Sequence, residues 1–173
     1  INQIKILDLS NCIKLKNIGI YAFTKNQIKQ LKLPDNIEEI KWSAFLKNQI
    51  KILDLSNCIK LKNIREAAFR ENQIKHLKLP KNIEEIEGST FKYNQIEILD
   101  LSNCIKLKHI VFDAFSSNPL NEIKILDNVL LEYDEYFYFL KDPWNTFTKY
   151  YNDNKMKSGD YKYNNNEWKW YPL

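Results

Sequence analysis

Hydrophobic residues recur along most of the chain in a pattern that returns every 22 to 24 residues. In its first copy the apolar positions are Ile4, Leu7 and Leu9. Leu7 and Leu9 are two residues apart, so on a strand both side chains point to the same face. The pattern therefore predicts a short strand in each copy, with its leucines turned inward and with Ile6 and Asp8 turned outward.

A second apolar group follows each predicted strand and ends at a phenylalanine. The phenylalanines are Phe23, Phe45, Phe69, Phe91 and Phe115. Their regular spacing predicts a continuous stack of rings along the side of the molecule opposite the strands.

Two segments recur almost unchanged. The first, residues 2–18, returns without change at 48–64, and at 94–110 it differs only at Glu97 and His109. A repeat of this length indicates a coil of stacked rungs, because one rung cannot bury its own leucines whereas stacked rungs bury them against each other.

The second segment, residues 26–40, returns at 72–86 with two substitutions. Two unlike units of 24 and 22 residues therefore alternate along the chain. The predicted rungs are 2–25, 26–47, 48–71, 72–93 and 94–117, with a degenerate sixth at 118–130. Only three glycines and five prolines are present, so asparagine is expected to make the turns.

Each rung carries the spacing L-x-x-L-x-L-x-x-N/C that is typical of leucine-rich repeats. The last position of this spacing reads Cys12, Asn36, Cys58, Asn82, Cys104 and Asn128. We expect this column to be buried and its cysteines to be reduced. Cysteines two rungs apart lie about 10 Å apart, whereas a disulfide needs Cα atoms within about 7 Å, and a shared zinc site fails for the same reason.

The predicted fold is mainly β: a right-handed leucine-rich-repeat solenoid of five full rungs and a partial sixth, with a C-terminal cap. The solenoid is assigned to residues 1–130, and the cap is assigned to the aromatic-rich residues 131–173. Because a solenoid end exposes apolar surface unless something covers it, the cap is expected to shield the last rung.

The cap has its own local signals. Asp142 followed by Pro143 predicts a helix N-cap and first turn, and a helix that continues to about Tyr151. Residues 161–163 and 168–170, separated by three asparagines and one glutamate, predict a hairpin.

Charges alternate in sign from rung to rung. The residues that directly follow the first inward-facing residue of each predicted strand are Asp8, Lys32, Asp54, Lys78, Asp100 and Lys124. On the opposite side they read Lys16, Glu38, Lys62, Glu84 and Lys108. The net charge is only +4, and an alternating ladder cancels its own field at a distance. This favours cross-strand ion pairs over an electrostatic comb for a charged partner or a nucleic-acid interface, which usually shows a basic stripe.

No catalytic constellation is visible in the sequence. His76 and His109, the two histidines, are expected on opposite sides of the coil. There is no nucleophile–base pair, carboxylate dyad, glycine-rich phosphate loop or metal motif. The chain is therefore predicted not to be an enzyme and to need no cofactor or metal. It also lacks an apolar stretch long enough to insert into a membrane.

The rung LDLSNCIKLKNI followed by A-F resembles the BspA-like leucine-rich repeats of bacterial and some protist surface proteins. Residues 143–171 are similar to a closing module found after such arrays. Its marked positions are Trp144, Phe147, Tyr151, Gly159, Tyr161 and Trp168. The resemblance implies a cell-surface or secreted location, an adhesin-like role and a protein partner, in some relatives a host matrix protein.

The predicted function is non-catalytic protein binding through the concave sheet. The candidate contact residues are Ile6, Gln30, Ile52, His76, Ile98 and Glu122, the outward column that varies most between rungs. Two alternatives stay open: a structural spacer or assembly unit without a ligand, and attachment to carbohydrate or cell wall through the tail. The tail's candidate aromatic platform is Trp144, Tyr161, Tyr163, Trp168 and Trp170.

The first rung is expected to leave an open strand edge, because nothing in this sequence precedes it. Further rungs upstream in a longer protein, or self-association of the chain through this edge, would cover it.

Overall fold

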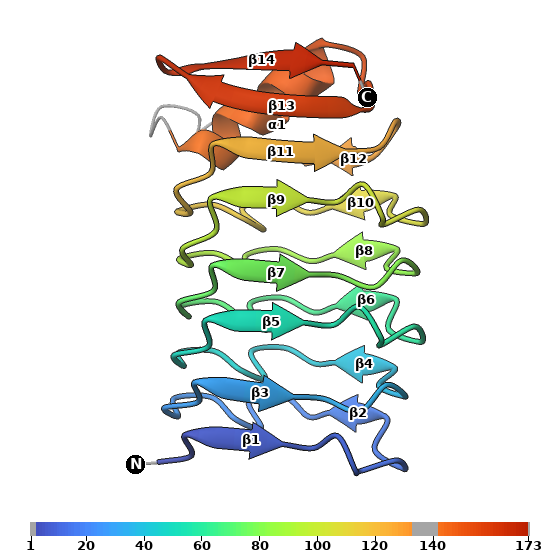
Figure 1. Cartoon of the computed structure of the whole chain (residues 1–173), viewed down its shortest axis with the longest axis vertical. Helices are drawn as coiled ribbons and strands as arrows, with labels where there is room; N and C mark the ends of the chain where they lie inside the picture. Colours follow the sequence, from blue (N-terminus) through green and yellow to red (C-terminus); the bar gives the residue numbers. More distant parts are fainter. Residues whose placement is uncertain (1–2, 133–141, 173) are drawn as a thin grey trace.

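The computed structural model describes residues 3–132 and 142–172 and confirms the predicted mainly β solenoid (Figure 1). Each rung places one strand at the front and one at the back. The front strands are β1 (Ile6–Asp8), β3 (Gln30–Lys32), β5 (Ile52–Asp54), β7 (His76–Lys78), β9 (Ile98–Asp100) and β11 (Glu122–Ile125). The back strands are β2 (Asn17–Ile18), β4 (Glu39–Ile40), β6 (Asn63–Ile64), β8 (Glu85–Ile86), β10 (His109–Ile110) and β12 (Leu130–Leu131).

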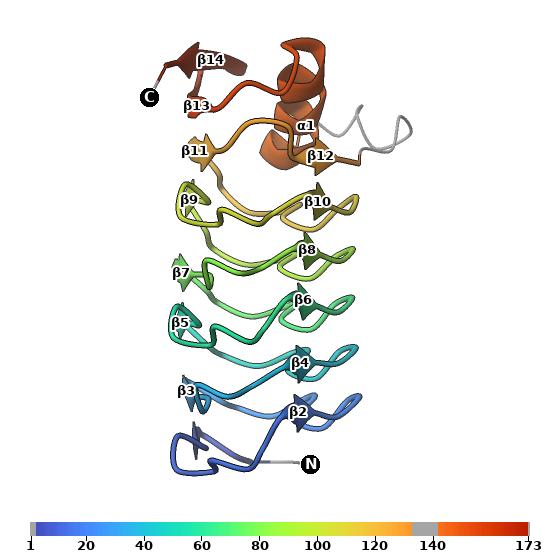
Figure 2. The ribbon, with the colours of Figure 1, turned by 90° about the vertical axis from the view of Figure 1, so that its right-hand side faces the viewer.

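The rungs stack almost straight, one above the other (Figure 2). Strands occur on both sides of the coil, and Figure 2 shows the front and the back rising by about the same amount over the whole stack. The face expected to be concave is therefore nearly flat. We call it the front face below.

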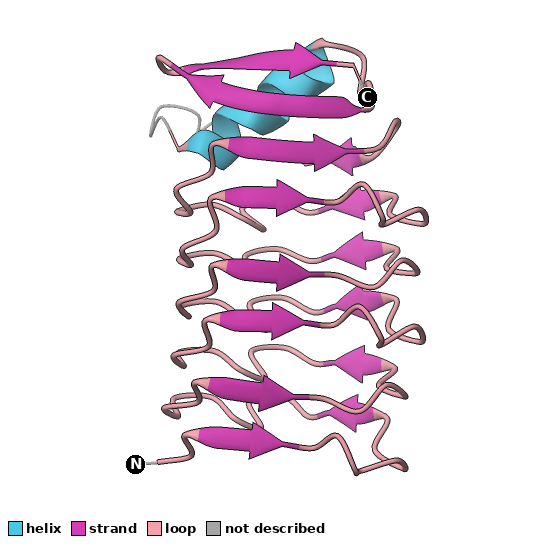
Figure 3. Cartoon of the chain, in the orientation of Figure 1, coloured by secondary structure: helices cyan, strands magenta, loops and turns pink. Residues whose placement is uncertain are grey.

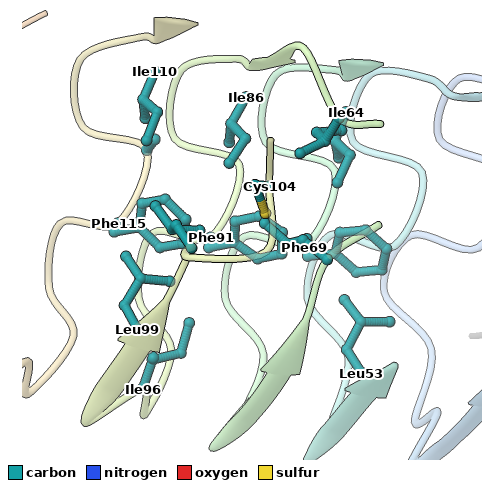
Figure 4. Packing of buried hydrophobic residues seen from close by; sticks show 14 of the residues in the cluster. Leu53, Ile64, Phe69, Ile86, Phe91, Ile96, Leu99, Cys104, Ile110 and Phe115 are labelled. Atoms are coloured by element: carbon teal, nitrogen blue, oxygen red, sulfur yellow. The ribbon is translucent and has the colours of Figure 1, made fainter. Parts of the chain in front are cut away.

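The core is a column of stacked side chains (Figure 4). The phenylalanine rings stack as predicted, with neighbouring centroids 5.2 to 5.7 Å apart from Phe23 to Phe115. Trp144 then closes the stack, 4.9 Å from the ring of Phe115. Aromatic pairs of this kind contribute about 0.5–1.5 kcal/mol each beyond their buried area.

A column of buried asparagines runs beside the phenylalanines. Its members are Asn26, Asn48, Asn72, Asn94 and Asn118. In the middle of the column, the amide nitrogen of Asn72 donates to the carbonyl oxygens of Phe45 (2.9 Å) and Phe69 (3.1 Å), and its side-chain oxygen accepts from the backbone amide of Ile50 (3.2 Å). One side chain thus ties together the backbones of adjacent rungs.

Asparagine lies in the turn after every front strand, as expected, and Asn128 there has a positive φ of 57°. The corners around the phenylalanines are made by other residues. Each of the five full rungs holds two residues with positive φ, placed two before and two after its phenylalanine. They are Tyr21, Lys25, Ser43, Lys47, Ala67, Glu71, Ser89, Tyr93, Asp113 and Ser117, with φ between 52° and 61°. Backbone hydrogen bonds between rungs fix these corners, for example from the Lys47 amide to the Arg70 carbonyl (3.0 Å).

The cysteine–asparagine column is only partly buried, which corrects a second expectation. Cys58 and Cys104 are buried, but Cys12 is exposed because no rung covers it in this chain. Asn82 is partly exposed, where its amide donates to the Ile59 carbonyl (2.9 Å), and Asn128 is exposed. All three cysteines are free.

The front strands associate in pairs, while the back strands form one continuous sheet of six. β1 pairs with β3, β5 with β7 and β9 with β11, all in parallel. In the front ladder, Asp54 lies 3.7 Å from Lys78 within one such pair. Asp8 and Lys32 pair likewise at 3.5 Å, but among the described residues no ion pair joins Asp100 to Lys78 or to Lys124, so the predicted front ladder is reduced to two separate pairs.

The C-terminal end carries helix α1 (Pro143–Asp153), the strands β13 (Gly159–Asn164) and β14 (Glu167–Tyr171), and no further rung in the described residues (Figure 3). The predicted helix cap is confirmed, since the Asp142 side chain accepts from the amides of Trp144 and Asn145. The predicted hairpin is also confirmed, and β13 pairs antiparallel with β11, which closes the front sheet. β12 lies across the boundary expected at residue 130.

Gly159 begins β13 at a point where only glycine fits. A Cβ there would collide with the indole of Trp170 and would lie 2.8 Å from the Tyr171 carbonyl oxygen. The close approach of β14 to β13 therefore depends on this residue.

Candidate partner-binding face

The six predicted contact residues do form one column on the front face. Ile6, Ile52 and Ile98 expose 65%, 62% and 54% of their surface. Gln30 and His76 are exposed between them, and Glu122 at the C-terminal end is half-buried. Large apolar side chains therefore point into solvent on every second rung.

A second column of exposed isoleucines lies at the turn that follows the front strand of the first, third and fifth rungs, called odd rungs below. Ile13, Ile59 and Ile105 expose 78%, 52% and 67% of their surface. The sequence contained the signal, because LSNCIK recurs unchanged in three rungs, but we did not predict this column. It adds a second set of exposed apolar side chains beside the first.

The turn isoleucines project because odd rungs are longer than even ones. The connection from the second inward leucine to the isoleucine of the back sheet is longer in the odd rungs. It runs from Leu55 to Ile64 in the third rung and only from Leu79 to Ile86 in the fourth. The additional residues lie in the turn that carries Ile59. Odd rungs thus form ridges, and even rungs lie lower between them.

A groove of about 980 Å³ lies over β7, between two such ridges. β7 and β9 belong to different sheets, and Figure 1 shows them further apart than β5 and β7. The gap opens the groove down to the leucines below it: Leu77 is half-buried, whereas Leu53 and Leu99 are each only 1% exposed. Ile59, Ile98 and Ile105 line its sides.

The two rims of the groove carry opposite charges. Lys75, Lys78 and Lys81 lie along the β7 side, and Glu97 and Asp100 lie along the β9 side. Asp100 oxygen Oδ1 accepts from the hydroxyl of Ser102 (2.5 Å). The groove therefore offers an apolar floor between a basic and an acidic rim.

The groove contains one cysteine, whose thiol is unreactive. Its cysteine, Cys104, is buried, and burial raises the pKa of the thiol to about 12. Such a thiol stays protonated and is a poor nucleophile at neutral pH. Within residues 3–132 and 142–172, no cluster of three or more His, Cys, Asp or Glu side chains could hold a metal ion.

The histidines lie on opposite sides of the coil, as predicted. His76 is exposed on the front face beside the groove. His109 lies on the back, where its two ring nitrogens are 3.1 Å from Glu85 and 2.8 Å from Glu132. His109 on β10 therefore contacts β8 through Glu85 and the end of β12 through Glu132, and it has a structural role.

The aromatic platform predicted in the tail is largely wrong. Trp144, Tyr161 and Trp168 are buried, with exposed fractions of 0%, 0% and 5%. Their rings pack around Phe147 and against the last rung, because the cap needs its own core. Of the five predicted residues, only Trp170 is exposed and Tyr163 is half-buried, which leaves too little aromatic surface for a platform.

Helix α1 has 11 residues. Over the part of the chain that the structure describes, no helix combines the length and apolar character that a membrane span requires.

Comparison with known proteins gives one match. The family model described as BspA type leucine rich repeat region matches residues 16–142 in six copies. Neither a curated protein nor a solved structure matches the chain.

Proposed function

Because the chain belongs to the BspA-type leucine-rich repeat family, we propose that it is a non-catalytic protein-binding module that uses its front face. The observation that carries the proposal is the groove over β7, with exposed isoleucines on its sides and an accessible leucine at its floor. Exposed apolar grooves rimmed by polar residues often mark sites of protein interaction. In a bacterial surface or secreted protein, this face would act as an adhesin-like contact.

The back of the molecule supports the choice of the front. Its sheet is continuous and is crossed by ion pairs between neighbouring rungs, such as Lys62 with Glu84 at 3.1 Å. Arg65 lies between Glu39 (3.1 Å) and Glu87 (2.6 Å) in the same way. Charges that are paired in this manner are already satisfied and offer less to a partner than the front groove does.

A binding assay with front and control variants tests the proposal. Purified fibronectin, laminin and collagen serve as probes for matrix binding, and each is immobilised for surface plasmon resonance. We expect the double variant Ile52→Lys/Ile98→Lys to lose binding, while Leu130→Lys, which changes an exposed apolar residue of the back sheet, retains it. Both variants should fold, because all three side chains are exposed.

The alternatives give different outcomes. Binding that survives in the front variant but is lost in Trp170→Ala would support attachment through the tail. The burial of Trp144, Tyr161 and Trp168 speaks against this alternative. If no variant and no wild-type chain binds a matrix protein or a displayed peptide, the molecule is a spacer.

Self-association is a second mode of contact that we propose for this 173-residue chain. Among the described residues no strand pairs with the outer edge of β1, and Leu7 and Leu9 beneath it are only half-buried. Open strand edges pair readily with other chains. Sedimentation over a wide concentration range should show association that Leu7→Lys/Leu9→Lys abolishes, and a strictly monomeric wild-type chain would contradict it.

A further inference from the structure

The two halves of the front face are near copies that differ in charge at two positions. Residues 26–40 and 72–86 differ at Asp35, which becomes Lys81, and residues 48–64 and 94–110 differ at Lys51, which becomes Glu97. Lys81 and Glu97 both line the groove over β7. The first difference replaces a negative charge by a positive one, and the second replaces a positive charge by a negative one. Both new charges lie on the rims of the groove.

We infer that the groove over β7 binds an extended segment of a partner protein that carries an apolar side chain between one acidic and one basic residue. The inference rests on the proposed function and specifies the chemistry of its partner. The apolar side chain would lie between Ile59 and Ile105, over Leu77. The acidic residue would face Lys75 and Lys81, and the basic residue would face Glu97 and Asp100.

Four of the five rim charges are available for such a partner, while Lys78 pairs with Asp54 at 3.7 Å. Among the described residues, Lys75, Lys81, Glu97 and Asp100 form no ion pair. Charges that lack a counterpart on their own chain gain the most when a ligand brings one, particularly where the ligand also excludes water.

The dimensions of the groove fit an extended chain. Its two ridges, at Ile59 and Ile105, are two rungs or about 10 Å apart, whereas the basic and acidic rims lie on the neighbouring rungs of β7 and β9. An extended segment rises about 3.3 Å per residue, so charged residues two to four positions apart can reach both rims. An apolar side chain between them would fill the gap that the missing β7–β9 pairing leaves.

The position of opposite charges on the two rims also defines specificity. A uniformly basic or uniformly acidic segment would meet a like charge on one rim, and like-charge juxtaposition is strongly unfavourable at an interface. Polyanions are disfavoured for the same reason. The groove therefore selects for segments with charges of both signs.

A displayed library of random 12-residue peptides tests the inference with the whole chain as bait. We expect the enriched peptides to carry an apolar residue with Asp or Glu within four positions on one side and Lys or Arg within four positions on the other. Ile105→Glu should weaken their binding at least tenfold in fluorescence anisotropy. The matched control Ile13→Glu changes the equivalent residue of the first rung, which is 78% exposed and lies outside the groove, and should change the Kd less than twofold.

A charge exchange gives the second readout. Glu97→Lys introduces the residue that the first and third rungs have at this position, so folding should not suffer. Libraries selected on this variant should lose the preference for the basic residue, while Lys51→Glu should leave the preference unchanged.

Four outcomes would overturn the inference. They are the failure to enrich any peptide, enriched peptides without charges of both signs, equal binding to Ile105→Glu and wild type, and an unchanged preference on Glu97→Lys. If Ile52→Lys/Ile98→Lys loses peptide binding and Ile105→Glu retains it, the front face is the binding surface but the groove over β7 is not the binding site.

Discussion

The buried asparagine column offers the sharpest test of what holds the rungs together. Replacing Asn72 by alanine removes three hydrogen bonds at once: those to the Phe45 and Phe69 carbonyl oxygens and the one from the Ile50 amide. The side chain is 7% exposed, so water does not readily take its place. We expect a large loss in the free energy of unfolding.

The size of this loss depends on which of the three backbone partners of Asn72 keep another hydrogen bond in the variant. The Ile50 amide has no other acceptor among the described residues, and leaving a buried amide unsatisfied costs about 1–3 kcal/mol. The two carbonyl oxygens each keep a second donor, because Asn48 also reaches Phe45 (3.0 Å) and Asn94 also reaches Phe69 (3.0 Å). Each of these losses costs about 0.5–1.5 kcal/mol. The total expected loss is about 4 kcal/mol.

Equilibrium unfolding in urea, followed by circular dichroism, measures this loss. With a slope near 2 kcal/mol per molar urea, the midpoint should fall by about 2 M. The matched control is Asn82→Ala in the same rung, whose amide makes one hydrogen bond at a partly exposed site (2.9 Å) and should cost about 1 kcal/mol or less. If both variants lose the same stability, the asparagine column does not carry the role assigned to it.

Three further predictions concern single positions. Lys25→Gly should stabilise the fold by about 0.5–1 kcal/mol in the same urea assay, because Lys25 is exposed with φ of 53°, where glycine pays no steric penalty; a loss of stability would contradict this. Asp54→Lys should cost about 1 kcal/mol at low salt and less at high salt, since it replaces the attraction to Lys78 at 3.7 Å by repulsion; an effect independent of salt would show that the pair is not electrostatic. In a thiol titration at pH 8, Cys12 should react in the native protein, whereas Cys58 and Cys104 should react only after unfolding, because burial raises their pKa to about 11 and about 12; two or three rapidly reacting thiols would refute the assignment of the core.

Repeats made most of the fold predictable. A strand in which Leu53 and Leu55 point inward, and a phenylalanine in every rung, follow from spacing alone because identical sequence in successive rungs has to make identical contacts. The helix after Asp142 and the hairpin of the cap were also predictable, since both rest on local capping and turn chemistry. These features depend on neighbours in sequence or on exact equivalents in the next rung.

The parts that were missed depend on how unlike rungs fit together. The buried asparagine column that contains Asn72 was not predicted, and burial was expected instead in the cysteine–asparagine column that contains Asn82. Both columns carry asparagine at a regular spacing, and only their hydrogen bonds tell them apart. The groove over β7 was not predicted, because it arises from a difference in turn length and from the missing pairing with β9. Burial of Trp144 could not be read from composition either, since an aromatic-rich tail is equally compatible with a platform and with a core.

The pairing of front strands has a consequence for how such a molecule can change in length. A segment of 46 residues, such as residues 2–47, contains one odd and one even rung and restores the pattern of inter-rung contacts when it is copied or removed. A single rung does not, since it would place two ridges or two low rungs next to each other and bring like charges into register. Duplication in units of two rungs would therefore extend the coil by about 10 Å at a time. Each such step would add one more ridge and one more low rung without any new side-chain packing, so the extent of the binding surface can evolve by recombination between near-identical coding segments while the fold stays unchanged.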